Sequence, residues 1–200
     1  MVKIAVDVVL LPSEAVMNQA IEANKGLSKQ YSDQIILDKK GCLPHISLAM
    51  GCMDKQEIPI IEKILYAIAD KYNPGQLNIA GISIETIALG EKISSFEVEK
   101  TDKLQLLHEE VMRITTPYFS YDVTEEMVLS PPTVGESTLL WIRNYPEKSA
   151  ISNFFPHITI GYGQLEEFPF TTVFTASKLA LCHLGNHCTC RKVLTAVKFD

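Results

Sequence analysis

The first part of the chain has a hydrophobic pattern that predicts a strand followed by a helix. Apolar residues recur at every second position over 4–10, which is the period of a half-buried strand. Ser13 and Glu14 then open a stretch of helical character, which we expect to reach about Tyr31. A strand and a helix therefore come first.

The next segments continue this alternation. Short strand-like runs at 35–38 and 43–50 are followed by a predicted helix over 57–72, where apolar side chains fall three and four residues apart. The sequence "NPG" at 73–75 ends that helix. Further strand-like segments are expected at 77–89 and 94–100.

A third amphipathic helix is predicted over 102–116, and we expect His108 on its exposed surface. Pro131 and Pro132 mark a connection, after which "STLLWIRN" (137–144) has the pattern of a strand.

The chain ends in two strand-like runs, 173–184 and 191–199, joined by the turn-rich "GNHCTC". Because strands and helices alternate mostly without the long crossovers of a parallel sheet, the predicted fold class is α+β.

Composition narrows the possible functions. The 200 residues carry a net charge of −6 and no dense Lys or Arg block, which argues against a protein that wraps long nucleic acid. No run approaches 18 apolar residues, and Asp7 and Pro12 interrupt the N-terminal run, so we expect neither a membrane span nor a signal peptide. Five cysteines, an odd number, do not suggest a secreted disulfide framework, and we expect a cytoplasmic protein.

One octet occurs twice in the chain. "PHISLAMG" at 44–51 returns as "PHITIGYG" at 156–163, with four identical residues at matching positions. A third His-x-Thr, "HCT" at 187–189, lies in a Gly-Asn turn without a following aliphatic strand, so we treat it as a chance match. The repeated octet is therefore the candidate functional motif.

Strand geometry predicts which side chains of the octets lie together. Successive residues point to opposite faces, so His45 and Ser47 share one face, as do His157 and Thr159, while the aliphatic residues between them face the core. The same alternation places Tyr162 in the core. Each strand would thus form a wall between a core and a cleft.

This set of side chains suits a phosphodiester. If the two strands converge, one neutral imidazole can accept a proton from attacking water, and the other, protonated, can give one to the leaving oxygen. Ser47 and Thr159 can donate hydrogen bonds to non-bridging phosphate oxygens. We expect His45 and His157 to be catalytic, with no metal or cofactor.

The chain resembles the two-histidine (2H) phosphoesterases, which include 2′-5′ RNA ligase-like proteins and cyclic nucleotide phosphodiesterases. The resemblance rests on the paired motifs at 45–47 and 157–159 and extends to flanks such as "VDVVLLP", "WIRNYPEKSA" and "NFFPHITIG". Ser47 stands where the family more often has Thr.

The resemblance implies one domain over 1–200, built of two interwoven lobes, with an antiparallel sheet in each lobe, a cleft between them and helices outside. It also implies metal-independent opening or making of phosphodiesters at 2′ and 3′ ribose positions, on a small nucleotide or an RNA end.

Three further residues are candidates for the site. Arg143 could reach a ligand phosphate with its forked donors or could be a surface residue. Phe155 could stack on a nucleobase or pack in the core. Asp7 could orient a catalytic imidazole.

Two alternatives stay open. The same cleft could belong to a non-catalytic module that binds an AMP-like nucleotide without turnover, and in either case we expect a monomer. A zinc site is the other alternative, from five soft ligands near the C-terminus: Cys182, His183, His187, Cys188 and Cys190.

Overall fold

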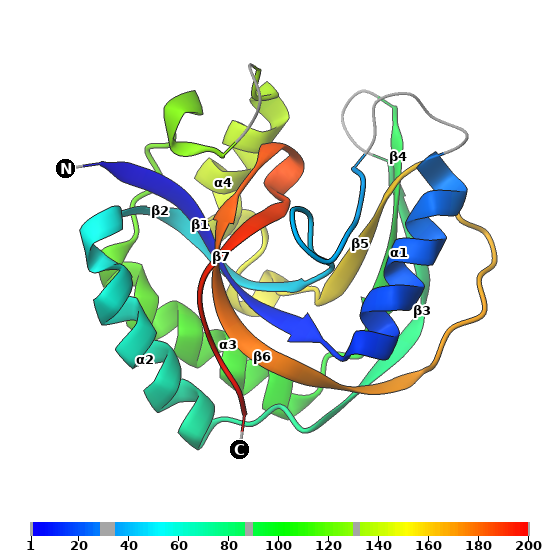
Figure 1. Cartoon of the computed structure of the whole chain (residues 1–200), viewed down its shortest axis with the longest axis horizontal. Helices are drawn as coiled ribbons and strands as arrows, with labels where there is room; N and C mark the ends of the chain where they lie inside the picture. Colours follow the sequence, from blue (N-terminus) through cyan, green and yellow to red (C-terminus); the bar gives the residue numbers. More distant parts are fainter. Residues whose placement is uncertain (1, 29–34, 87–89, 130–132, 200) are drawn as a thin grey trace.

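The structure, a computed structural model, describes residues 2–28, 35–86, 90–129 and 133–199 (Figure 1). The strands are β1 (Lys3–Pro12), β2 (Ile46–Asp54), β3 (Gln76–Thr86), β4 (Lys92–Val98), β5 (His157–Tyr162), β6 (Val173–Leu184) and β7 (Cys190–Val197). The α-helices are α1 (Glu14–Ser28), α2 (Ile58–Lys71), α3 (Asp102–Thr115) and α4 (Glu136–Lys148). The α+β class is confirmed.

The described strands form one seven-stranded sheet in the order β2-β1-β6-β3-β4-β5, with β7 also paired to β6, and every pair is antiparallel. Two separate sheets were expected, and the long strand β6 is the reason for the difference. Its first residues pair with β3, and the remainder pairs with β1 and β7. The sheet thus has two halves joined through β6.

Both faces of β1 are buried, and this explains the near-continuous apolar run at the N-terminus. Val6, Val8 and Leu10 belong to the main core, together with the apolar faces of the helices. Val9 and Leu11 point the other way and pack with apolar residues of β6 and β7 in a second, smaller cluster. The strand therefore separates the main core from the face that carries the candidate site.

The helices are placed by their apolar stripes. α2 lies against β6 and β7, α3 against β2, and α1 against β5 in the other half of the sheet (Figure 1). Thr101 accepts a hydrogen bond from the Leu104 amide and caps the start of α3. No helix in the described ranges is long and apolar enough to cross a membrane.

Several sequence predictions are wrong. "STLLWIRN" lies in helix α4, because Thr138, Ile142 and Tyr145 are the buried residues and their spacing of four and three is helical. Residues 35–38 form no strand. His108 is fully buried rather than exposed. The predicted connection at Pro131 and Pro132 falls outside the described residues, as do the ends of the segments expected to reach Tyr31 and residue 89.

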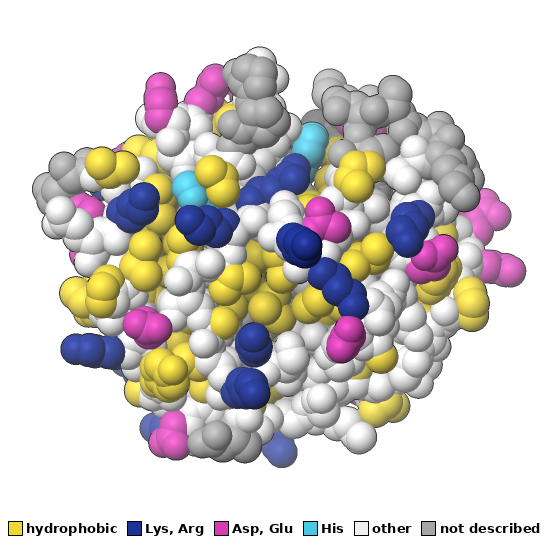
Figure 2. All heavy atoms as spheres, viewed as in Figure 1, with side chains coloured by type: hydrophobic (Ala, Val, Ile, Leu, Met, Phe, Trp, Pro, Cys, Tyr) yellow, Lys and Arg dark blue, Asp and Glu magenta, His cyan; other side chains and the backbone are white. Residues whose placement is uncertain are grey.

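The surface agrees with the composition. In Figure 2, Lys and Arg side chains are interspersed with acidic ones on the face shown and do not form a single basic block. A protein that neutralises many phosphates along a duplex needs a continuous basic surface.

Candidate active site

The two motif strands come together although they are not hydrogen-bonded neighbours. β2 and β5 stand at opposite ends of the strand order, yet their Cα atoms approach within 8 Å. His45 immediately precedes β2, and His157 is the first residue of β5. A positive charge on His157 lowers the pKa of His45, so the two imidazoles lie within electrostatic reach of each other.

The two imidazoles are held in the same way. Nδ1 of His45 lies 2.8 Å from the Leu43 carbonyl oxygen, and Nδ1 of His157 lies 2.8 Å from the Phe155 carbonyl oxygen. Because a carbonyl only accepts, Nδ1 carries the proton in both rings. Each Nε2 is then left to accept a proton or to carry one. Each imidazole can therefore exchange a proton at Nε2 while its Nδ1 contact holds the ring.

Both motif strands bulge at the equivalent position. Ser47 pairs with Val9 and Ala49 with Val8, which leaves Leu48 as an extra residue in β2. In β5, Thr159 pairs with Ser95 and Gly161 with Ser94, which leaves Ile160 as the extra residue. The repeated octets thus fold to repeated local structure, and each strand bends just after its hydroxyl residue.

The bulge refines the prediction for Tyr162. An extra residue reverses the alternation, so Tyr162 returns to the face of His157 and Thr159, where it is half-buried and still packs against the main core. Its hydroxyl lies 2.7 Å from Nδ1 of His187, in the turn η5 (Asn186–Cys188) between β6 and β7. This contact joins the second motif strand to the other half of the sheet.

Sequence reasoning missed both members of that contact. The "HCT" sequence is interpreted above as a chance match, although His187 lies beside the motif strand. His187 and Cys188 both have left-handed backbone conformations, with φ of 59° and 52°. Asn186 Oδ1 accepts hydrogen bonds from the Gly135 amide and the Thr138 hydroxyl at the start of α4, which anchor this turn. No local sequence signal predicts the bulge in β5 that brings the Tyr162 side chain to His187.

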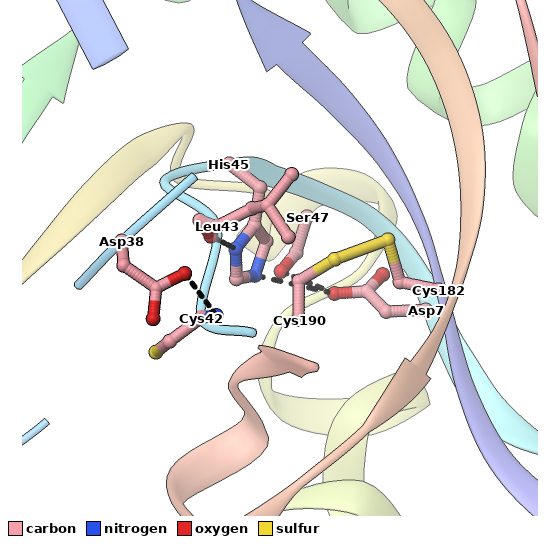
Figure 3. Close-up of a disulfide and its surroundings, with 8 residues drawn as sticks. All are labelled: Asp7, Asp38, Cys42, Leu43, His45, Ser47, Cys182 and Cys190. Atoms are coloured by element: carbon pink, nitrogen blue, oxygen red, sulfur yellow. Dashed lines mark hydrogen bonds and ion pairs between the residues drawn. A yellow bond between two sulfur atoms is a disulfide. The ribbon is translucent and has the colours of Figure 1, made fainter. Parts of the chain in front are cut away.

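Asp7 lies directly beside the first motif, as Figure 3 shows. Ser47 Oγ lies 2.6 Å from Asp7 Oδ2, and His45 Nε2 lies 3.9 Å from the same oxygen. The Asp7 side chain is fully buried, and its Oδ1 has no hydrogen-bond partner among the described residues. Asp7 was expected to orient an imidazole, and the structure places its shortest contact on Ser47 instead.

Burial pushes His45 and Asp7 toward their uncharged forms. The pKa of His45 falls from 6.5 to about 4, chiefly through burial, opposed by its hydrogen bond to Leu43. Burial raises the pKa of Asp7 well above its ordinary value, opposed by the Ser47 hydroxyl and, to a smaller extent, by the nearby backbone of Ala49. Both directions disfavour an ion pair across the 3.9 Å contact. His45 is therefore unprotonated at neutral pH.

The other candidates fall in different places. Phe155 is 43% exposed, and its ring centroid lies 5.8 Å from that of His157, so it borders the site. Arg143 lies in a helix rather than a strand, and it points away from the face of α4 that carries Ile142 and Tyr145. Its contact with a ligand phosphate stays a prediction.

The cysteine and histidine cluster does not gather around a metal. Cys182 and Cys190 are joined in a disulfide between β6 and β7, with Cα atoms 5.6 Å apart. His183 points to the opposite face, where its Nε2 contacts the Met127 carbonyl oxygen at 3.0 Å. In the described ranges, no three His, Cys, Asp or Glu side chains could hold a metal ion. The zinc alternative is not supported, and the disulfide was not expected.

Comparison with known proteins places the fold. The sequence matches no family model and none of the curated proteins. Among solved structures, the chain is similar to TT0787 of Thermus thermophilus, with a TM-score of 0.62, 15% sequence identity and 98% of each chain covered. The two chains share a fold. At this identity the similarity extends to the architecture, and the chemistry has to be argued from the site.

The buried histidines predict acid sensitivity. His45 and His108 both have a pKa of about 4, below 6.5, so the unfolded chain binds more protons between these values. Stability should therefore fall as pH falls from about 6.5 to 4, by about 2 kcal/mol per histidine at pH 5. Urea unfolding at pH 7 and pH 5 measures this loss.

Matched variants isolate the effect. His45→Gln and His108→Gln should each show a smaller loss between pH 7 and pH 5 than the wild-type chain. Asp7, whose raised pKa acts in the opposite direction, is present in all three proteins. His45→Gln changes a neighbour of Asp7, so the comparison of His108→Gln with the wild-type chain is the cleaner one. Equal losses of stability in all three proteins between pH 7 and pH 5 would show that the two buried histidines do not cause the acid sensitivity.

Proposed function

We propose that this protein is a phosphodiesterase that acts on 2′,3′-cyclic phosphates or on 2′-5′-linked nucleotide and RNA ends, by paired-histidine acid-base catalysis. The observation that carries this proposal is the matched geometry of His45 and His157. Each ring is fixed through Nδ1 by the carbonyl two residues before it. The strands that follow the two histidines, β2 and β5, stand at opposite ends of the sheet and approach each other. The resemblance to the 2H phosphoesterases supports the same chemistry.

The two histidines take different roles. Neutral His45 is the general base: its Nε2 accepts a proton from water as the water oxygen attacks phosphorus. His157 is the general acid and gives its Nε2 proton to the ribose oxygen that leaves as its bond to phosphorus breaks. If the 3′ oxygen leaves, a 2′,3′-cyclic phosphate becomes a 2′-monophosphate.

Neighbouring residues hold the substrate. Thr159, two residues after His157, offers a hydroxyl to a non-bridging phosphate oxygen as negative charge develops there. Phe155 presents an exposed ring beside His157, where a nucleobase can stack. Stacking tolerates every base, so the proposal includes all four nucleotides.

Phosphorus NMR of the protein with the four nucleoside 2′,3′-cyclic phosphates tests this function. We expect conversion to a 2′-monophosphate, unchanged by EDTA, since the two histidines supply both proton transfers. A protein-free sample controls for spontaneous opening. A nucleotide that binds in calorimetry, with no turnover of cyclic phosphates or of 2′-5′-linked dinucleotides, would contradict the proposal and favour a binding module.

A further inference from the structure

The contact between Ser47 and Asp7 raises a question of proton supply. A hydroxyl has one proton, and non-bridging phosphate oxygens only accept hydrogen bonds. If Asp7 is ionised, the Ser47 proton is directed at Asp7 Oδ2, 2.6 Å away, and Ser47 has nothing to donate to a phosphate. If Asp7 is protonated, it can donate to Ser47 Oγ, and the Ser47 proton is free to turn into the cleft.

The surroundings of Asp7 favour the protonated form. Its side chain is fully buried, and Cys182 of the disulfide stands opposite it in the pairing of β1 with β6. The titratable groups that face it from the packed elements are His45 next to β2, Tyr145 of α4 and Cys188 of η5. None of these is a cation at neutral pH, and no described Lys or Arg contributes to the pKa of Asp7.

The second motif lacks this arrangement. Asp7 pairs with Met50, five residues after His45, and the equivalent position beside β5 is Ile93, which pairs with Tyr162. An apolar side chain there cannot take the proton of Thr159. The carboxyl beside Ser47 is thus a feature of one half only, although the strand geometry of the two halves is repeated.

We propose that Asp7 is a positioning residue that acts through Ser47. As a neutral carboxylic acid it donates to Ser47 Oγ and turns the Ser47 proton toward the bound phosphate, and its ionisation withdraws that donor. This inference rests on the proposed function, because it assigns a phosphate group to the cleft. The pKa of Asp7, raised by burial, supports it.

Sulfate binding measured by calorimetry from about pH 5 to pH 9 tests the proposal, because the charge of sulfate does not change over this range. Asp7→Asn is the matched variant: its amide donates to Ser47 Oγ at every pH and has nearly the same shape. The wild-type protein and the variant should have equal affinity for sulfate at low pH. Once Asp7 ionises in the wild-type protein, the variant should bind sulfate about tenfold more tightly.

Two further measurements separate positioning from a structural role. In a Ser47→Ala background, the Asp7→Asn substitution should leave sulfate affinity unchanged at every pH. An infrared difference spectrum of wild type minus Asp7→Asn should show the carbonyl band of a protonated carboxylic acid, which disappears over the pH range where sulfate affinity falls. The infrared titration of the wild-type protein, with isotope-labelled aspartate, gives the answer even if a variant does not fold.

The outcomes distinguish this inference from the function on which it rests. A constant affinity ratio across a pH range over which the carboxylic acid band disappears, or a missing carboxylic acid band, would overturn the role of Asp7 even in a protein that opens cyclic phosphates. Diverging sulfate affinities in a protein that opens none would support Asp7 and contradict the phosphodiesterase. Failure of the wild-type protein to bind sulfate at any pH would overturn the role of Asp7, and turnover of cyclic phosphates alone would then decide the phosphodiesterase.

Discussion

Replacing either His45 or His157 with alanine should lower the rate of cyclic phosphate opening by about 10²- to 10⁴-fold. Each imidazole handles a different proton of the same displacement, so neither can substitute for the other. The pKa of about 4 at His45 also means that the acid limb assigned to this base should lie near pH 4 rather than 6.5. Initial rates by phosphorus NMR, with pH profiles, measure both effects.

The double variant makes the test sharper. Two groups that act in one step are not additive, so His45→Ala with His157→Ala should be at most about tenfold slower than the slower single variant. His183→Gln is a matched control, because His183 is another strand histidine of the same sheet but points to the opposite face. It should keep wild-type turnover. Near-wild-type turnover in both alanine variants would rule out the proposed mechanism.

His108→Ala should lower the free energy of unfolding by about 3–5 kcal/mol. The side chain is fully buried and stacked on Phe154 with ring centroids 3.9 Å apart. Its Nδ1 donates to the Leu48 carbonyl oxygen at 2.8 Å, and its Nε2 accepts from the Ile151 amide at 2.8 Å. Truncation would leave a cavity and two unpaired backbone groups.

The position of His108 links the two motifs. Leu48 is the bulge residue of the first motif strand, and Ile151, with φ of 55°, lies six residues before His157. His108→Phe keeps a ring for stacking but removes both hydrogen bonds, and should still cost about 2 kcal/mol or more. Leu106→Ala, on the exposed side of the same helix, should stay within about 0.5 kcal/mol. Urea unfolding of the three variants measures these changes in the free energy of unfolding. A loss below about 1 kcal/mol in His108→Ala would contradict the structural role given to His108.

Much of the fold could be predicted from local pattern. The predicted strand at 4–10 lies within β1, the helix expected over 57–72 corresponds to α2, and the one expected over 102–116 corresponds to α3. In these segments the hydrophobic period is the one their secondary structure requires. "STLLWIRN" was assigned wrongly because its apolar cluster suits a short strand as well as a helix, and Leu140 and Trp141 are in fact exposed.

The sequence by itself determined the chemistry that is available at the site. A repeated octet predicted that two imidazoles and two hydroxyls share faces of two strands, because alternation along a strand is a local property. It also placed an aromatic residue two positions before His157 and a carboxylate on β1.

Only the tertiary structure decided how these groups are used. The bulge at Ile160 moves Tyr162 to the face of His157 and Thr159, and the course of the sheet brings its two terminal strands together. Burial then sets the charge of His45 and Asp7, and only the pairing of β1 with β2 places Asp7 against Ser47. Register, burial and desolvation depend on contacts between distant segments, so no local pattern encodes them.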